Sequence, residues 1–202
     1  TSFSGDDLHR NDMYKANAVR AQLEQSAGSY EDYLLSLAMT AVIHPFEAIY
    51  LPRIAQLTGK SNQFNLTTRR YTTAEIEAVA ADEGKIALYG SLADRFGDNG
   101  VVSVVIGEKD GNTLDVVLWI MSCRVLKRGM EAAMLDALAA AARRGNISTL
   151  RGHYYPTAKN GMVREFYGEL GFTRISADEE GNSLWELPLD GYTDKNNIIK
   201  VV

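Results

Sequence analysis

Cysteine, histidine and proline are scarce in this chain. Its 202 residues include one cysteine, three histidines and four prolines. A single cysteine excludes an internal disulfide. The histidines stand far apart at positions 9, 44 and 153, and no group of histidines or carboxylates has the spacing of metal ligands, so we expect no metal site.

Long hydrophobic runs and an excess of positive charge are also missing. The apolar stretches are short and no signal-peptide pattern opens the chain, so we expect a cytoplasmic protein that does not enter a membrane. Lys and Arg number 21 against 26 Asp and Glu, which gives a formal net charge of -5. This balance excludes a general polyanion-binding surface, and nucleic acid is not an expected partner. Any phosphate site has to be local.

What the sequence does contain is enough apolar material, 46%, for one core. The chain starts at Thr1 in a polar stretch, as an excised piece of a longer protein would. Residues 7–39 show helical spacing in two segments, the first only thinly apolar. We therefore expect residues 1–39 to form a helical linker or extension and residues 40–202 to form one domain.

Within residues 40–202 the hydrophobic periodicity predicts alternating strands and helices. Thr73 is the expected N-cap of the helix that opens with "YTTAEIE". Strands are expected at 41–45, 85–94, 100–109, 113–123, 148–156, 173–178 and 183–189, and helices at 46–60, 71–82, 129–144 and 160–172. Three of the strands follow one another as an antiparallel meander, and the last two form a hairpin.

This order of elements resembles the GNAT acyltransferase fold over about residues 40–190, an α/β (α+β) fold with a mixed, mostly antiparallel sheet flanked by helices. In that family a turn of the form R/Q-x-x-G-x-G/A holds the pyrophosphate of coenzyme A at a helix N-terminus, where free N-H groups attract anions. Here the turn reads "RVLKRG". The resemblance thus assigns Arg124, Lys127, Arg128 and Gly129 to cofactor binding. Lys127 replaces the family's first glycine, which argues for a single phosphate on phosphopantetheine rather than whole coenzyme A.

A more specific resemblance is carried by longer blocks. "RIAQLTGKSNQFNLTTRRY", "DRFGDNG", "MSCRVLKRG", "YYPTAKN" and "FYGELGF" occur in the order seen in the C-terminal half of FkbH-like glyceryltransferase/phosphatases of polyketide biosynthesis. The resemblance implies transfer of a glyceryl-type unit, from a phosphorylated glycolytic metabolite, to the phosphopantetheine thiol of an acyl carrier protein. It also implies a haloacid-dehalogenase-like (HAD) phosphatase domain as partner, fused or separate, because this chain has no D-x-D-x-T motif.

Four residues are candidates for catalysis. Cys123 precedes three cations and a helix start, which favours a thiolate nucleophile, although a lone cysteine is usually an inert core residue. The resemblance places His153 beside the V-shaped gap that admits the pantetheine arm, as a base for Cys123 or as a half-buried structural histidine. Asn160 would orient His153, bond the pantetheine or cap a helix, and Tyr167 would protonate a leaving thiolate or pack in the core.

The polar segment "NQFNLTTRRY" is the expected reader of a small hydroxylated acyl group, between two helices that wall the acyl pocket. Its candidate substrate residues are Asn62, Gln63, Asn65, Thr67 and Arg69. A solvated loop is the alternative, and "DRFGDNG" is expected to be only a β-turn. Two other functions stay open: an N-acetyltransferase that uses acetyl-coenzyme A directly, and a non-catalytic module that docks a carrier protein.

Overall fold

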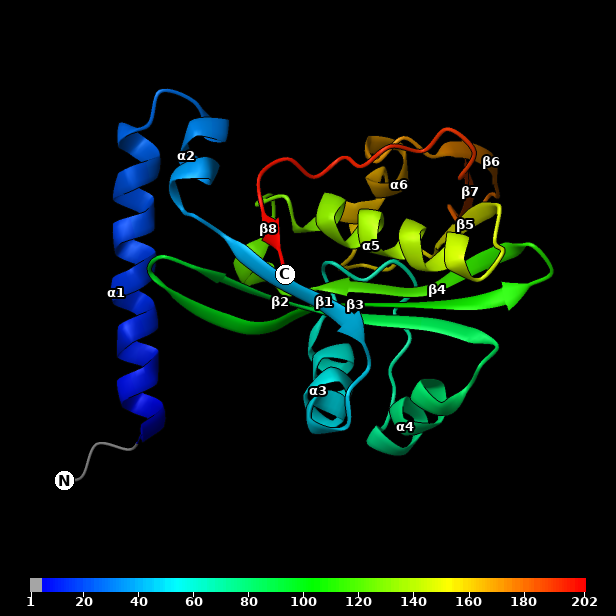
Figure 1. Ribbon diagram of the computed structural model, residues 1–202, viewed down its shortest axis with the longest axis horizontal. Coiled ribbons are helices and arrows are strands. Elements are labelled where there is room, and N and C mark those ends of the chain that lie inside the picture. The colour runs from blue at the N-terminus through cyan, green and yellow to red at the C-terminus, as the bar shows by residue number, and fades with distance from the viewer. Residues whose placement is uncertain (1–4) are drawn as a thin grey trace.

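The computed structural model describes residues 5–202, and their side chains from Asp7 onward. One eight-stranded sheet, in the order β6-β7-β5-β4-β3-β2-β1-β8, forms the middle layer. Neighbouring strands are antiparallel except for the parallel pairs β1–β8 and β4–β5. As Figure 1 shows, α3 and α4 cover one face, α5 and α6 cover the other, and α1 stands beside one edge of the domain. The predicted mixed sheet with a helical extension is confirmed.

The N-terminal extension contains the two expected helices, α1 (Gly5–Ser26) and α2 (Tyr30–Ser36). Ser29 caps α2, because its hydroxyl accepts the N-H of Asp32 at 3.0 Å. Most of α1 is exposed, and Arg20 is its one buried residue among those whose burial is described. The thin apolar pattern of residues 7–26 thus corresponds to a helix held mainly by one polar anchor.

The first half of the sheet and its helices follow the sequence closely. A capping box fixes the start of α4, but its N-cap is Thr72, so the expectation of Thr73 is wrong by one residue. These elements are β1 (Thr40–Pro45), the 3-10 turn η1 (Ala48–Tyr50), α3 (Leu51–Lys60), α4 (Thr73–Ala81), β2 (Lys85–Asp94), β3 (Gly97–Asp110) and β4 (Thr113–Met121). Strands β2, β3 and β4 form the predicted meander.

The second half departs from expectation in two places. Residues 160–172 do not form one helix, because the chain makes only a 3-10 turn and a four-residue helix there. A short last strand, unpredicted, pairs with β1. The elements are the 3-10 turn η2 (Cys123–Val125), α5 (Met130–Arg144), β5 (Thr149–Tyr154), η3 (Gly161–Val163), α6 (Phe166–Glu169), β6 (Thr173–Ala177), β7 (Ser183–Pro188) and β8 (Lys200–Val201).

Two apolar clusters sandwich the sheet. The larger one lies under α5 and α6 and includes Trp119, Leu138 and Tyr167. The smaller one lies under α3 and α4 and includes Ile54 and Ile76. Alternate residues of β4 supply both clusters, as expected of a strand covered on two faces.

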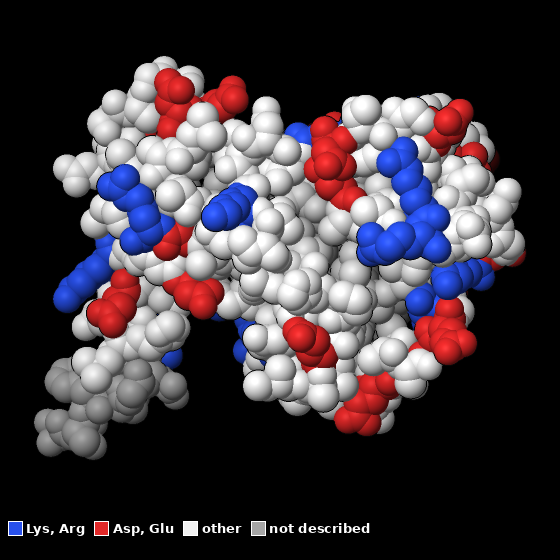
Figure 2. Space-filling model, in the orientation of Figure 1, with Lys and Arg blue, Asp and Glu red and all other residues white. Residues whose placement is uncertain are grey.

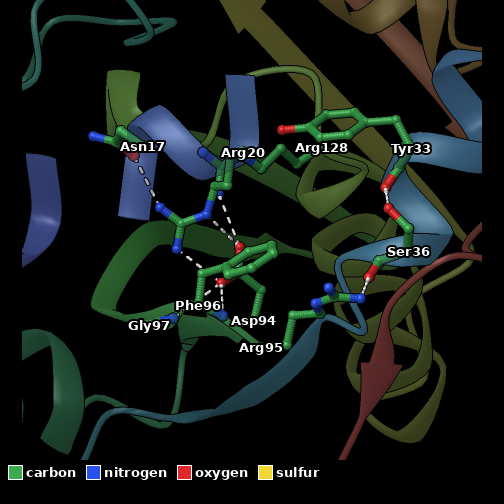
Figure 3. Close-up of polar contacts among 9 residues, drawn as sticks. All are labelled: Asn17, Arg20, Tyr33, Ser36, Asp94, Arg95, Phe96, Gly97 and Arg128. Carbon is green, nitrogen blue, oxygen red and sulfur yellow. Dashed lines mark hydrogen bonds and ion pairs between the residues drawn. The ribbon is translucent and has the colours of Figure 1, made fainter. Parts of the chain in front are cut away.

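A buried ion-pair cluster fastens α1 to the β2–β3 turn. The side chain of Asp94 is only 1% exposed and that of Arg20 is 6% exposed. Arg20 donates from Nε and Nη2 to the two carboxylate oxygens, both at 2.7 Å, while the N-H of Phe96 donates to Asp94 at 2.9 Å. Arg128 approaches the same carboxylate at 3.7 Å (Figure 3). The turn within "DRFGDNG" is thus formed by Arg95 and Phe96, between the paired residues Asp94 and Gly97, and Asp94 also carries a tertiary contact. Residues 97–100, expected in the turn, belong to β3.

This cluster sets the protonation of Asp94. Burial raises the pKa of the carboxyl, but the hydrogen bonds from Arg20 and Phe96 and the charges of Arg20 and Arg128 outweigh it, so the pKa of Asp94 lies below its usual value. The ion pair therefore stabilises the fold at pH values above the ordinary carboxyl pKa, and this contribution is lost as the pH falls through the lower pKa of the folded state.

We predict that Arg20→Ala lowers the free energy of unfolding by about 3 kcal/mol at neutral pH, because it leaves a buried carboxylate without its main partner. Asn17→Ala is the matched control. It removes only the acceptor of the third Arg20 contact, at 2.9 Å on the exposed face of α1, and should cost less than about 1 kcal/mol. Urea unfolding curves measure both.

The difference in unfolding free energy between wild type and Arg20→Ala should shrink as the pH falls toward 2, because protonation of Asp94 removes the ion pair from the wild type as well. Equal losses in Arg20→Ala and Asn17→Ala, or a difference independent of pH, would contradict this account of the cluster.

Candidate functional site

The candidate site lies where β4 and β5 part. Their parallel pairing covers only Thr113–Val116 against Thr149–Gly152, while β4 continues to Met121 and β5 to Tyr154. Past these pairs the two strands leave a wedge-shaped opening in the sheet. The resemblance assigned this opening to the pantetheine arm of an acyl donor.

Residues 64–67, here called the inserted segment, fill that opening. The N-H of Met121 donates to the carbonyl of Phe64 at 3.1 Å, and the N-H of Leu66 donates to the carbonyl of Trp119 at 3.2 Å. On the other side the N-H of Tyr155 donates to the carbonyl of Leu66 at 2.9 Å. The inserted segment thus hydrogen-bonds with both strands and takes the backbone groups that a bound arm would need.

The side chains of the inserted segment are buried, which makes the insertion costly to undo. Phe64 and Leu66 are 5% and 0% exposed, and the Phe64 ring packs edge-on against Phe166 with centroids 4.9 Å apart. Exposing both side chains would cost about 4 kcal/mol before any hydrogen bond is counted. In the state described, the gap between β4 and β5 is therefore closed.

Two predicted substrate residues serve this closure. Asn65 is 1% exposed, donates to the carbonyl of Ser61 at 3.0 Å and accepts the N-H of Thr68 at 2.9 Å. Thr67 donates its hydroxyl to the carbonyl of Val117 at 2.7 Å. Because these groups are already paired within the chain, both residues have a structural role, and their assignment as readers of the acyl group stays a prediction.

Asn160 also has a structural role. It is 0% exposed, and its amide nitrogen donates to the carbonyls of Asn65 and Tyr155, both at 2.9 Å. Its oxygen accepts the N-H of Thr157 at 2.7 Å. Asn160 therefore holds the inserted segment against the end of β5; it neither orients His153 nor caps the following turn with its side chain. Its assignment as a catalytic residue is corrected accordingly.

Tyr167 occupies the core under β4 and β5. Its ring lies against the backbone of Gly152, where an added Cβ would come within 2.6 Å of the ring. Burial raises the pKa of this hydroxyl, and the backbone of His153 is the polar group nearest to its oxygen. Tyr167 therefore packs in the core, and its role as an acid for a leaving thiolate stays a prediction.

Cys123 is exposed at the start of η2, at the outer end of β4. It lines a cavity of about 340 Å³, here called the cysteine cavity, together with Asn62, Gln63 and Arg124. The structure thus brings together the nucleophile candidate and two of the predicted substrate residues, whose amides are able to donate to and accept from a small polyol.

His153 lies elsewhere. Its Nε2 is 2.8 Å from Oδ1 of Asp115, and both residues line a separate cavity of about 550 Å³ that also includes Arg69 and Tyr155. The strand register pairs Gly152 with Val116, and Cys123 is seven residues further along the chain, so roughly 20 Å separates the two side chains. His153 therefore does not act as the base for Cys123. Arg69 lies in the cavity of His153 and does not line the cysteine cavity.

The turn 124–129 has the expected shape but not the expected free donors. Lys127 and Gly129 are both left-handed, with φ of 61° and 95°, which explains the family's preference for glycine at these places. The N-H of Lys127 donates to the Glu131 carboxylate at 3.1 Å, and Arg128 turns inward to Asp94. A carboxylate of the chain thus occupies the anion position, while Arg124 remains at the mouth of the cysteine cavity.

A third cavity of about 390 Å³, the α5 cavity, lies between the start of α5 and α6. Lys127, Gly129 and Ala132 line one side, and Phe64, Met162 and Phe166 line the other. It is mostly apolar, as small-molecule sites commonly are. The α5 cavity is open although the gap between β4 and β5 is closed.

Asp115 and Glu131 are functional candidates that the sequence did not single out. Nothing in the local pattern "TLDVVL" distinguishes Asp115 from a solvated strand carboxylate, since its partner His153 lies 38 residues away. Glu131 did carry a signal, because an acid in the first turn of a helix commonly accepts from the free N-H groups there.

No helix within residues 5–202 is long and apolar enough to cross a membrane. In the same part of the chain no three His, Cys, Asp or Glu side chains gather as metal ligands would.

We predict that Asn160→Ala lowers the free energy of unfolding by about 3 kcal/mol, because two buried carbonyls and one N-H lose their partners together. Lys159→Ala, an exposed neighbour, should change it by less than about 0.5 kcal/mol. Urea titration followed by tryptophan fluorescence suits the measurement, since Trp119 lies on β4. An unfolding free energy unchanged in Asn160→Ala would show that the inserted segment is not held as described.

No protein-family model matches the sequence, and no curated protein resembles it closely enough to count as a match. Solved structures do match. The ribosomal-protein-S18-alanine N-acetyltransferase of Escherichia coli superposes with a TM-score of 0.55 at 14% identity, covering 74% of this chain and 94% of that chain. The GNAT domain of S. lividans PAT superposes with a TM-score of 0.57 at 16% identity, covering 72% of this chain and 89% of that chain.

The PaiA N-acetyltransferase of Thermoplasma acidophilum, solved in complex with coenzyme A, gives a TM-score of 0.56 at 12% identity and covers 74% of this chain and 99% of that chain. These identities are too low to carry more than the architecture. The GNAT part of the resemblance is thereby confirmed, and the chain has the GNAT acyltransferase fold.

Proposed function

We propose that the protein is an acyltransferase whose acyl group is carried as a thioester of phosphopantetheine. The observation that carries the proposal is the fold, with its parted β4 and β5 and the three cavities around the opening. The structural neighbours named as acetyltransferases, one of them with coenzyme A bound, support acyl-coenzyme A as the donor.

In this form of the reaction an acceptor amine attacks the thioester carbonyl. The new C-N bond forms, the C-S bond breaks, and the thiol of coenzyme A leaves with the proton. The α5 cavity is the place for the donor, since it lies at the N-terminus of α5 and is apolar enough for the pantetheine chain. The His153–Asp115 pair is a base for the acceptor, because a carboxylate on Nε2 leaves Nδ1 free to accept a proton.

Three observations favour a second form of the reaction, in which the acyl group is first bound covalently to Cys123. The closed gap, the Glu131 carboxylate on the turn and the exposed Cys123 beside Asn62 and Gln63 all fit a covalent route better than direct use of coenzyme A. The Cys123 thiolate attacks an activated glyceryl-type group, an acyl phosphate, and phosphate leaves. The phosphopantetheine thiol of a carrier protein then attacks the Cys123 thioester, and its proton passes to the released Cys123 sulfur. The HAD-like phosphatase domain and the acyl carrier protein are partners only in this second form of the reaction.

We predict that Ala132→Phe weakens the binding of acetyl-coenzyme A at least tenfold in titration calorimetry, because the ring fills the α5 cavity. Ala140→Phe, on the exposed face of the same helix, should leave the affinity unchanged. Equal affinities of the two variants, or no heat of binding in wild type, would contradict donor binding in this cavity.

For the covalent form we predict a glyceryl mass increase on the wild-type chain after incubation with the triose donor, the phosphatase partner and the carrier. Cys123→Ala should carry no adduct and load no carrier, because the acceptor sulfur is gone. Ser61→Ala, in the same cavity, is the control and should load normally. Intact-mass spectrometry reads both proteins, and a carrier loaded by Cys123→Ala would exclude the covalent role.

A further inference from the structure

The largest of the described cavities shares Arg53, Lys60 and Arg124 with the cysteine cavity, and its other residues have no role in the proposed function. It has a volume of about 820 Å³ and is enclosed by α1, α3, η2 and the start of β3. Its cationic lining residues are Arg10, Arg53, Lys60 and Arg124, and His9 and Asn99 complete its polar wall. Figure 2 shows the hollow between the lower part of α1 and the body of the domain. We call it the α1–α3 cavity.

Three of its cations have no carboxylate partner within residues 7–202. The described lining contains no Asp or Glu, and Arg53, Lys60 and Arg124 take part in none of the ion pairs found among residues 7–202. Arg53 donates to the amide oxygen of Gln56 at 2.8 Å, and Arg124 points at the sulfur of Met13 at 3.7 Å. In a chain of net charge -5, such a gathering marks a site for a negative ligand.

Two further observations agree. Burial, and then the charge of Arg124, lower the pKa of Arg53, as expected of cations held together without a counter-charge. Among the described residues no acceptor faces the amide nitrogen of Asn99, which is buried. A buried donor without a partner costs free energy that an anionic oxygen would recover.

The α1–α3 cavity continues into the cysteine cavity. Arg53, Lys60 and Arg124 line both, so that a ligand whose phosphate lies among the cations extends past Ser61, Asn62 and Gln63 to Cys123. Arg53 and Lys60 are seven residues apart on α3 and therefore face the same side, about 10 Å from each other along the helix. By contrast the turn 124–129, where the fold would hold a phosphate, already carries the Glu131 carboxylate.

We propose that the α1–α3 cavity binds the phosphate of a phosphopantetheine group, and that the arm enters the site over α1 and α3 instead of through the closed gap between β4 and β5. The inference rests on the second, covalent form of the proposed function for the identity of the arm, and it is an alternative to donor binding in the α5 cavity. The same phosphopantetheine chemistry is available from coenzyme A and from a holo-carrier protein, and the experiment separates the two.

The experiment is titration calorimetry on the full chain with four probes: 4′-phosphopantetheine, pantetheine without phosphate, coenzyme A and a holo-carrier protein with its apo form as blank. We expect 4′-phosphopantetheine to bind at least tenfold more tightly than pantetheine, and its affinity to fall as salt is added. The double variant Arg53→Gln, Lys60→Gln should lose at least tenfold in affinity for every phosphate-bearing probe, since each removes a charge-assisted contact.

The matched control is the double variant Lys159→Gln, Arg174→Gln, which removes the same charge from exposed positions outside the cavity and should bind like wild type. Thermal unfolding checks that both double variants are folded. If coenzyme A binds and the carrier does not, the source is the free cofactor; tighter binding of the holo-carrier than of its apo form identifies the carrier as a source.

Binding that is unchanged in Arg53→Gln, Lys60→Gln, that is equal for pantetheine and 4′-phosphopantetheine, or that is absent for every probe would overturn the site. A loss of affinity seen only in Ala132→Phe would also overturn it, because that result would place the ligand in the α5 cavity. Because these readouts need no turnover, phosphate-dependent binding without any acyl transfer would sink the proposed activity and leave the cavity assignment standing.

Discussion

The hydrogen bonds that hold residues 64–67 between β4 and β5 are the constraint on which the rest of the site depends. The parallel pairing of these strands ends at Val116 and Gly152, and without another strand-like segment the backbone groups of Trp119 and Met121 would be left unpaired in the core. The inserted segment pairs them and buries Phe64 and Leu66. In doing so it closes the opening that the fold offers to a donor and separates the space around Cys123 from the space around His153.

This separation gives the molecule two chemically different sides. On one side lies a carboxylate–imidazole pair with mixed charges around it, suited to moving a proton. On the other lies an exposed thiol next to unneutralised cations, suited to a thioester with a phosphate attached. Asn160 and Thr67 stand at the boundary, and their hydrogen bonds are the reason that the two sides stay apart.

The N-terminal helix belongs to the second side. The Arg20–Asp94 pair fixes α1 beside the β2–β3 turn, and the same carboxylate holds Arg128 away from solvent (Figure 3). One buried charge thus links three segments distant in sequence: the extension, the meander and the turn before α5. Fixing α1 there is what encloses the α1–α3 cavity, because His9 and Arg10 supply its outer wall. The extension is in this sense a part of the candidate site as well as an appendage.

The resemblance of the element order to a known fold supplied the GNAT architecture. The sequence by itself determined most of that order, the meander and the helix over 130–144, because periodicity and turn chemistry are local properties that short windows reveal. It also placed Cys123 with Asn62 and Gln63 in one site, through the resemblance. Only the tertiary structure decided the contacts of Asn65, Asn160, Tyr167 and His153. Asn160 and His153 meet partners on other segments, 95 and 38 residues away. Long-range pairing of this kind produces no periodic pattern in the sequence. A polar side chain with no partner nearby in the sequence therefore finds one only when the sheet forms, as Asn160 does in the core and His153 does in a separate cavity.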